Sequence, residues 1–311
     1  MIETIAEHVM ERVHTPLCRG ILSTPPLQPK DDGVVLFSMI GTAVVIPYLV
    51  AVKSLHRHLG RGRVILLDDG TLTPEDKAVL ARHLGNPRII SIHDVDVGPC
   101  PKGGTWERLL TLLDLRRDDY VIQLDSDTVT VGPVPDVALA IDDNVSFTLL
   151  GADGDITESL PVAEFARRYF TKGVPDTGAY QGHVQGLIEA SLTQLSINGC
   201  LDPHYIRGCS GFTGFASGGN GRALAESFSQ AASALLGNKR WAEWGTEQVT
   251  SSFVIANDPG ARVLPPEYYT NFWDMPLPAD PRMIHFIGSF RHRGLEYVRR
   301  SWAEIKALRQ A

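Results

Sequence analysis

The sequence predicts an α/β fold in which helices cover both faces of a mainly parallel central sheet. Two observations favour this fold. From Val34 to Leu124, short apolar runs alternate with segments whose apolar residues recur at helical spacing. The apolar runs contain few polar residues, which is typical of parallel strands that are buried on both faces and joined by helices.

The individual elements follow from these patterns. Strands are expected at residues 34–40, 63–67, 88–92 and 120–124, with helices between them. The helix after Thr73 has the clearest boundaries, because Thr73 is a favourable N-cap, Asp76 can complete a capping box and Gly85 follows the helix end. Residues 34–52 carry no charge and are long enough to span a membrane. Pro47 and the polar residues in this run instead predict a strand, a turn and a helix.

The regular alternation fades after Val131. We predict one domain at residues 34–311, divided into a regular half (34–131) and a divergent half (132–311), with residues 1–33 as an amino-terminal accessory segment. The divergent half is expected to contain helices near residues 162–169, 184–195, 222–236 and 242–254, and strands near 212–216 and 283–287. A last helix would place its apolar side chains on one face, namely Leu295, Val298, Trp302, Ile305 and Leu308.

The composition excludes some classes of protein. The 311 residues carry a formal net charge of -7, which argues against a nucleic-acid-binding protein, because phosphate contacts need a basic surface. The four cysteines have no zinc-ribbon spacing, and the acidic amino terminus lacks the basic region of a secretory signal. We therefore expect a cytoplasmic protein with reduced thiols.

Three Asp-x-Asp pairs occur, and their surroundings distinguish them. Asp125 and Asp127 directly follow the buried run 120–124, at the kind of strand end where α/β sheets bind ligands. Two carboxylates at that edge can hold a divalent cation against a diphosphate. The pair Asp94 and Asp96 ends another strand and is the second candidate. The third pair, at residues 153 and 155, lies in a glycine-rich turn.

Motifs around these residues resemble family 8 glycosyltransferases, the group of glycogenin and the bacterial lipopolysaccharide galactosyltransferases. A helix that begins Thr-Trp-Glu-Arg-Leu at residues 105–109 precedes the strand end Leu-Asp-Ser-Asp at residues 124–127. The resemblance covers residues 34 to about 293, most of the chain. Further matches follow in the order of the family: Tyr48, Ser54 with Leu55, Ser210 with Gly211, the segment from Trp244 to Gln248, Leu264 with Pro265 and Asn271, and His285 with Gly288 and Arg291.

The resemblance implies a GT-A-like fold and a metal-dependent glycosyltransferase. Such an enzyme moves a hexose from a nucleotide-sugar, usually a UDP-sugar, to a carbohydrate or glycolipid acceptor with retention at the anomeric carbon. Residues 34–131 would then be the nucleotide-binding half and residues 132–311 the acceptor-binding half. By position, Asp125, Asp127 and His285 would ligate Mn²⁺ or Mg²⁺, and an imidazole beside two carboxylates suits manganese better.

The same motifs imply roles for the residues around the metal. Arg108 and Arg291 would face the diphosphate, where a guanidinium can make paired bonds to oxygens. Glu247 and Gln248 would be the catalytic pair beneath the sugar, the carboxylate as hydrogen-bonding partner or nucleophile and the amide as an orienting group. The other implied substrate contacts are Ser210, Gly211, Gly288, Gly41 and Thr42.

The sequence departs from the family at several places, and two of them affect the implied site. No Asp ends the first strand, where the turn is Ile40-Gly41-Thr42, and Glu247 stands where Asp is usual. A nucleotide-sugar-binding protein without transferase activity and a sugar-nucleotide nucleotidyltransferase therefore remain alternatives. A Rossmann oxidoreductase is not favoured, because the glycine-rich run 216–221 lacks the third glycine of the dinucleotide fingerprint and its surrounding βαβ unit.

The carboxyl-terminal helix suggests one further partner. Basic residues outnumber acidic ones from Arg291 onward, and the helix is expected to have one apolar face. This pattern resembles an interfacial amphipathic helix, so we expect a peripheral contact with the inner face of a membrane. A helix that only covers the core, with its charges in solvent, is the alternative.

Overall fold

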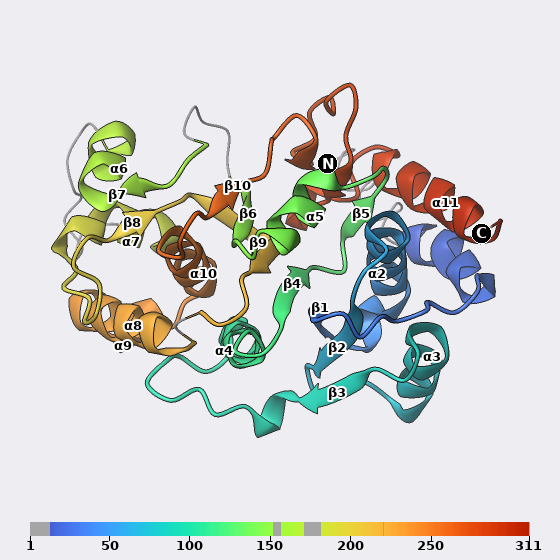
Figure 1. Ribbon diagram of the computed structural model, residues 1–311, viewed down its shortest axis with the longest axis horizontal. Helices are drawn as coiled ribbons and strands as arrows, with labels where there is room; N and C mark the ends of the chain where they lie inside the picture. The colour runs from blue at the N-terminus through green and yellow to red at the C-terminus, as the bar shows by residue number, and fades with distance from the viewer. Residues whose placement is uncertain (1–12, 152–156, 171–181, 220, 311) are drawn as a thin grey trace.

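The computed structural model describes residues 13–151, 157–170, 182–219 and 221–310, and its centre is a seven-stranded sheet in the order β10-β6-β9-β4-β1-β2-β3 (Figure 1). The predicted mainly parallel sheet is confirmed: β4 (Tyr120–Leu124), β1 (Val34–Ile40), β2 (Arg63–Asp68) and β3 (Arg88–Ser91) are parallel neighbours. The exception is β9 (Gly208–Phe215), which runs antiparallel to β4 and to β6 (Phe147–Leu150). The edge strand β10 (Arg262–Val263) is parallel to β6.

Helices cover both faces of this sheet, as the sequence predicts. The alternation of side chains along β1 shows the two cores, because Leu36 and Ile40 belong to one and Val35 and Phe37 to the other. The first core includes α2 (Val45–Leu59), α3 (Pro74–Leu84), α5 (Pro135–Asp142) and α11 (Glu296–Leu308). The second includes α4 (Trp106–Leu115), α6 (Val162–Tyr169), α7 (Val184–Ser191), α8 (Ala223–Leu236), α9 (Asn238–Trp241) and α10 (Thr246–Ala256).

A small three-stranded sheet brings the carboxyl-terminal part of the chain to the end of β4. Strand β5 (Thr128–Thr130) follows β4 after a turn and pairs antiparallel with β12 (Met283–His285), which is parallel to β11 (Tyr269–Asn271). The register sets His285 opposite Thr128. The remaining short elements are the β7–β8 pair (Leu160–Pro161, His204–Tyr205) and the 3-10 turns η1 (Arg19–Ser23), η2 (Thr42–Val44), η3 (Ile92–Asp94), η4 (Leu192–Gln194) and η5 (Gly288–Phe290).

Local sequence signals predicted several boundaries correctly. The Thr73 hydroxyl accepts from the backbone of Asp76, whose carboxylate accepts from the backbone of Thr73, and Gly85 ends the helix in the left-handed region. The uncharged run 34–52 divides into β1, η2 and the start of α2. No helix of the described residues is both long and apolar enough to cross a bilayer.

Two helix predictions are wrong in detail. Instead of one helix at residues 242–254, α9 ends at Trp241 and α10 begins at Thr246, because Gly245 between them takes a φ of 100°. The apolar face expected for α11 is also wrong, since Leu295 and Trp302 are each 57% exposed. The buried residues of α11 are Tyr297, Ser301, Glu304, Ile305 and Leu308.

The described part of the first 33 residues packs against the domain. Cys18, Ile21 and Leu27 are buried in the first core, and the ring of His14 stacks on Tyr297 of α11 at 3.8 Å between centroids. The helical spacing at residues 2–9 lies outside the described residues. All four cysteines are free.

Candidate functional site

Asp125, Asp127 and His285 converge at the carboxyl-terminal edge of the central sheet. The two aspartates follow β4, and the pairing of β12 with β5 brings His285 beside them. One possible ligand atom from each residue lies within 4.8 Å of the others, and no other such cluster of His, Cys, Asp and Glu occurs among the described residues. The pairing of distant strands therefore completes a site whose carboxylates are close together in the sequence.

Asp127 is the most buried carboxylate of the cluster, at 6% exposure. Its Oδ1 lies 3.3 Å from His285 Nε2 and accepts no hydrogen bond from the described residues, and its Oδ2 lies 3.2 Å from Arg291 Nη2. Burial opposes the charged form of Asp127, but His285 and Arg291 lower the pKa of this carboxyl below its ordinary value. Asp127 is thus held as a carboxylate with an oxygen available to a cation.

The ring of His285 is oriented by three neighbours. Asn271 Oδ1 lies 2.9 Å from His285 Nδ1, and Cys209 Sγ lies 3.4 Å from the same nitrogen. In the neutral ring, an Nδ1–H donated to the Asn271 side-chain carbonyl leaves the Nε2 lone pair facing Asp127. Gly211 of β9 packs on the ring, because a β-carbon there would lie 2.2 Å from His285 Cε1. Burial lowers the pKa of His285, but Cys209 and Asp127 raise it well above its ordinary value.

Arg108 of α4 lies between the carboxylate of Asp125 and the first turn of α10. Its guanidinium donates to Asp125 Oδ1 at 2.6 Å, to Ser210 Oγ at 3.1 Å and to Glu247 Oε2 at 2.9 Å. Burial opposes its charge, yet Glu247 and Asp125 raise the pKa of Arg108 above its ordinary value. Arg108 is therefore a cation throughout the physiological range, fixed between two carboxylates.

Glu247 lies beneath Arg108 and is 1% exposed. Its Oε2 accepts from Arg108 and, at 3.0 Å, from the Thr105 hydroxyl. Burial raises the pKa of Glu247 above its ordinary value, although Arg108 acts against this. The Glu247 carboxylate contacts the Arg108 guanidinium, and Arg108 in turn contacts Asp125. Glu247 is therefore connected to the metal cluster by way of Arg108.

Gln248 is half-buried and more open to the site than Glu247. Its Oε1 lies 3.3 Å from the backbone nitrogen of Ser210 and 3.4 Å from the Ser210 hydroxyl. Its Nε2 donates to Gln185 Oε1 of α7 at 3.3 Å. The structure therefore brings Ser210, Arg108 and Gln248 together, while Gly211 beside them contacts His285.

The predicted nucleotide contacts Gly41 and Thr42 lie at the end of β1, on the other side of the aspartates. The Thr42 hydroxyl donates to Asp76 at 2.6 Å, and the Thr42 backbone donates to the Thr71 hydroxyl at 3.1 Å. A β-carbon at Gly41 would lie 2.2 Å from a carboxylate oxygen of Asp69. Gly288 begins η5, and its carbonyl accepts from Arg291 Nε at 3.0 Å.

Comparison with known proteins identifies the fold. No protein-family model matches the chain, and no curated protein matches its sequence. The solved structure of WbbM, a bifunctional glycosyltransferase, matches 92% of this chain and 53% of its own at 17% identity, with a TM-score of 0.51. The fold is of the GT-A type, as the similarity to WbbM shows. The chain spans about half the length of WbbM.

Two further solved structures are similar at lower scores. An active-site mutant of LgtC shares 14% identity over 88% of this chain and 95% of its own, with a TM-score of 0.48. Mouse xyloside xylosyltransferase 1 shares 11% identity over 83% of this chain and 98% of its own, with a TM-score of 0.42.

Within this fold, the pair Asp94 and Asp96 lies apart from the cluster. Asp94 and Asp96 are exposed at the end of β3, and Asp96 accepts from the backbone of Gly98 at 2.9 Å, which is turn geometry. The third pair, at residues 153 and 155, lies outside the described residues. Of the two described pairs, Asp125 and Asp127 are the pair that belongs to the possible metal cluster.

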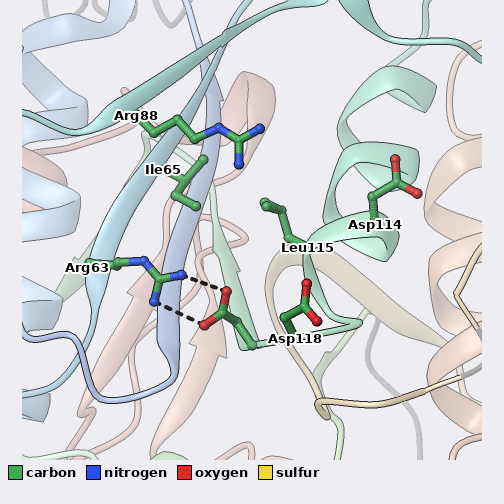
Figure 2. Close-up of a pocket in the computed structure, with 7 residues that line it drawn as sticks. Arg63, Ile65, Arg88, Asp114, Leu115 and Asp118 are labelled. Carbon is green, nitrogen blue, oxygen red and sulfur yellow. Dashed lines mark hydrogen bonds and ion pairs between the residues drawn. The ribbon is translucent and has the colours of Figure 1, made fainter.

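A hollow of about 470 Å³ lies at the opposite, amino-terminal edge of the sheet. Figure 2 shows Arg63, Arg88 and Asp118 around it. Arg63 Nη2 lies 2.7 Å from Asp119 Oδ2. Because β2 and β3 begin here, the hollow is separated from the Asp125 cluster by the length of the strands. It is no part of the candidate site.

Several residues of the site have roles that the sequence did not predict. Asn271 belongs to a family-like motif, but only the three-dimensional arrangement shows it beside His285 Nδ1. Thr105 likewise begins a recognised motif and contacts Glu247. No sequence pattern indicates a role for Gln185, which lies in the irregular part of the sequence. It contacts Gln248 only because α7 packs on α10.

Proposed function

We propose that this protein is a metal-dependent glycosyltransferase that moves a hexose from a UDP-sugar to a carbohydrate or glycolipid acceptor, with retention at the anomeric carbon. The observation that carries this proposal is the buried Oδ1 of Asp127, which accepts no hydrogen bond from the described part of the chain and faces His285 Nε2 at 3.3 Å. The position at the carboxyl edge of a GT-A sheet supports a nucleotide-sugar as the ligand.

The residues present fit a divalent metal. Asp125 and Asp127 would supply carboxylate oxygens and His285 its Nε2, and the contact with Asn271 favours the tautomer that leaves this nitrogen free. This mixed oxygen and nitrogen donor set favours Mn²⁺ over Mg²⁺. A bound divalent cation supplies positive charge that offsets the charge of a diphosphate leaving group.

The donor would lie across the edge of the sheet on both sides of the aspartates. Arg291, together with the turn at Gly288, is within reach of a diphosphate at Asp127, and Arg108 offers a fixed positive charge beside Asp125. Gly41 and Thr42 would contact the nucleoside at the end of β1. Ser210 and Gly211 would line the sugar side, although Gly211 mainly makes room for His285.

Gln248 and Glu247 would have different roles in catalysis. Gln248 would contact the sugar, since its amide lies at the open side of the site and is held by Ser210 and Gln185. Glu247 would act by fixing Arg108, because its carboxylate lies beneath the guanidinium. A buried, paired carboxylate is a poor nucleophile, so this arrangement favours a front-side route in which acceptor and diphosphate share one face of the sugar.

The two alternatives have less support. A nucleotide-sugar-binding protein without activity would not need Arg108 fixed by a buried carboxylate beside the metal ligands. A sugar-nucleotide nucleotidyltransferase would need a basic, glycine-rich phosphate loop directly after β1, where this chain has Gly41 and Thr42. A peripheral membrane contact of α11 is kept as a separate prediction, to be tested by flotation with anionic liposomes at low and high salt.

The experiment that tests the donor site is a thermal-shift panel of UDP, GDP, CMP and ADP, each with and without Mn²⁺. A ligand at a hundred times its dissociation constant stabilises the folded state by about 2.7 kcal/mol, which raises the melting temperature by several degrees. We expect the largest shift with UDP and Mn²⁺ together. Equal shifts with and without Mn²⁺ would contradict a metal-bridged diphosphate.

A further inference from the structure

Trp244 is exposed although it adjoins the candidate site. Its side chain is 71% exposed, and its indole N–H donates to none of the described residues. Its neighbours Trp106 and Trp241 are each 1% exposed, and their indole nitrogens donate to Thr246 and Ser229. The chain thus keeps two tryptophans in the core and presents the third to solvent.

The backbone around Trp244 holds the ring outside the core. Gly245 takes a φ of 100°, a conformation that favours glycine, and this turn separates Trp244 from α10. A β-carbon at Gly245 would lie 2.6 Å from His183 Cε1, so the imidazole packs closely on the turn. The His183 ring meets the Trp244 ring edge-on at 5.7 Å between centroids. The two exposed rings form one aromatic corner.

A continuous series of contacts joins this corner to the candidate catalytic side chains. His183 Nδ1 accepts from the backbone of Gln185 at 3.2 Å, and Gln185 accepts from Gln248. Gln248 in turn contacts Ser210, which accepts from Arg108. These contacts join the aromatic corner to the Asp125 cluster along α7 and α10, two of the helices on the second face of the sheet (Figure 1).

Between the aromatic corner and Ser210, the side chains in this series of contacts are uncharged. Gln185 and Gln248 offer amide groups, and the nearest charged residues of α9 and its loop, Arg240 and Glu243, neutralise each other at 2.6 Å. An aromatic face attracts C–H groups that carry partial positive charge, such as those on one side of a pyranose ring, and primary amides pair with hydroxyl groups. A neutral sugar combines both requirements, whereas an anionic or apolar ligand does not.

We propose that Trp244 and His183 form the subsite for a neutral pyranose of the acceptor, which stacks on the indole with its hydroxyl groups toward Gln185 and Gln248. This inference rests on the proposed function, because it names the ligand that approaches the donor from the α10 side. An acceptor held there can direct a hydroxyl toward Ser210 and Arg108, at the open side of the donor sugar. The donor's diphosphate and nucleoside, at the aspartates and the end of β1, do not contact this corner.

The test uses saturation-transfer NMR with methyl β-D-galactopyranoside and methyl β-D-glucopyranoside on the full chain. The variants are Trp244→Ala and Trp244→Phe, with Trp302→Ala as matched control, because Trp302 is also exposed but lies on α11. We expect at least one glycoside to receive saturation on its ring C–H protons in the wild type and in Trp302→Ala. Trp244→Ala should weaken its binding at least tenfold, and Trp244→Phe should keep most of it.

Equal binding by the wild type and Trp244→Ala would overturn the subsite, and so would the absence of signal from both glycosides with the wild type. Donor binding provides the separate readout: the thermal shift with UDP and Mn²⁺ should be the same in Trp244→Ala and the wild type. If the wild type binds the glycoside through Trp244 but never releases UDP from a UDP-hexose, the transferase is wrong and the carbohydrate subsite stands.

Discussion

Gly211 and His285 are in such close contact that any side chain at position 211 would displace the imidazole: a β-carbon there would lie between 2.2 and 2.6 Å from three atoms of the His285 ring. The ring is itself held by Asn271. A glycine on the antiparallel strand β9 is thus a structural requirement for the position of a candidate metal ligand.

This contact predicts the effect of Gly211→Ala. The added methyl group must displace the His285 ring, so Mn²⁺ affinity should fall at least about tenfold, with a loss of about 1–3 kcal/mol in the free energy of unfolding. Manganese EPR and urea unfolding measure the two quantities. Gly132→Ala is the control, because its β-carbon meets its nearest neighbour at 3.8 Å. Unchanged manganese binding in Gly211→Ala would refute the geometry.

A second prediction concerns Asp127. Asp127→Asn keeps the shape of the side chain but removes the charge that faces His285 and Arg291, so metal binding and UDP-hexose turnover should fall at least about a hundredfold. The fold should persist, as circular dichroism would show. Asp94→Asn, at the exposed end of β3, should behave as the wild type. Wild-type turnover by Asp127→Asn without added metal would remove Asp127 from the site.

A third prediction follows from the pair Glu247 and Arg108. Glu247→Gln removes the charge that fixes the guanidinium, so turnover should fall by about 10²–10³-fold, while donor affinity falls only about threefold. Because Glu247 acts through Arg108, the double variant with Arg108→Lys should lose little more than the worse single variant. Steady-state kinetics of the four proteins measure this coupling. Additive losses would mean that Glu247 contacts the substrate by itself.

Lys53 gives a prediction for stability against pH. This lysine is 3% exposed and contacts Thr24, the Pro25 carbonyl and His83. Among the described residues it has no carboxylate partner, and burial lowers its pKa to about 8. The unfolded chain keeps the ordinary pKa of about 10.4, so it binds the proton more tightly between these values. The charged lysine therefore destabilises the fold below pH 8, and this effect disappears as the pH rises.

Lys53→Met removes this dependence and gives the measurement. From pH 7.5 to 9.5, the free energy of unfolding of the wild type should rise relative to that of Lys53→Met by about 2 kcal/mol. Urea unfolding of both proteins in matched buffers measures the difference, in which the titration of other groups cancels. A constant difference across this range would show that Lys53 titrates normally.

Features that depend on neighbouring residues in the sequence were predicted well. The Thr73 capping box and the strand end before Asp125 are local, and each lies where its residues indicate. The face of α11 could not be predicted, because its buried side includes Ser301 and Glu304, which are satisfied by His14 and Arg57 from other segments. Apolar periodicity cannot find a polar face whose partners are distant.

The candidate site likewise has features that the sequence predicted and features that depend on packing. Motif order placed Asp125, Asp127 and His285 together, and the geometry agrees. The interposition of Arg108 between Asp125 and Glu247 was not predicted, since it depends on how α4 packs beside the first turn of α10. The same holds for Gly211, whose contact depends on the pairing of β9 with β4.

The most direct test of the account is the release of UDP from UDP-hexoses by metal-stripped protein, measured before and after Mn²⁺ is added. We expect UDP-glucose or UDP-galactose to be hydrolysed slowly without an acceptor, at a rate that rises at least about tenfold with Mn²⁺ and is abolished in Asp127→Asn. A rate that is the same with and without Mn²⁺, or no release from either UDP-hexose, would contradict a metal-dependent glycosyltransferase.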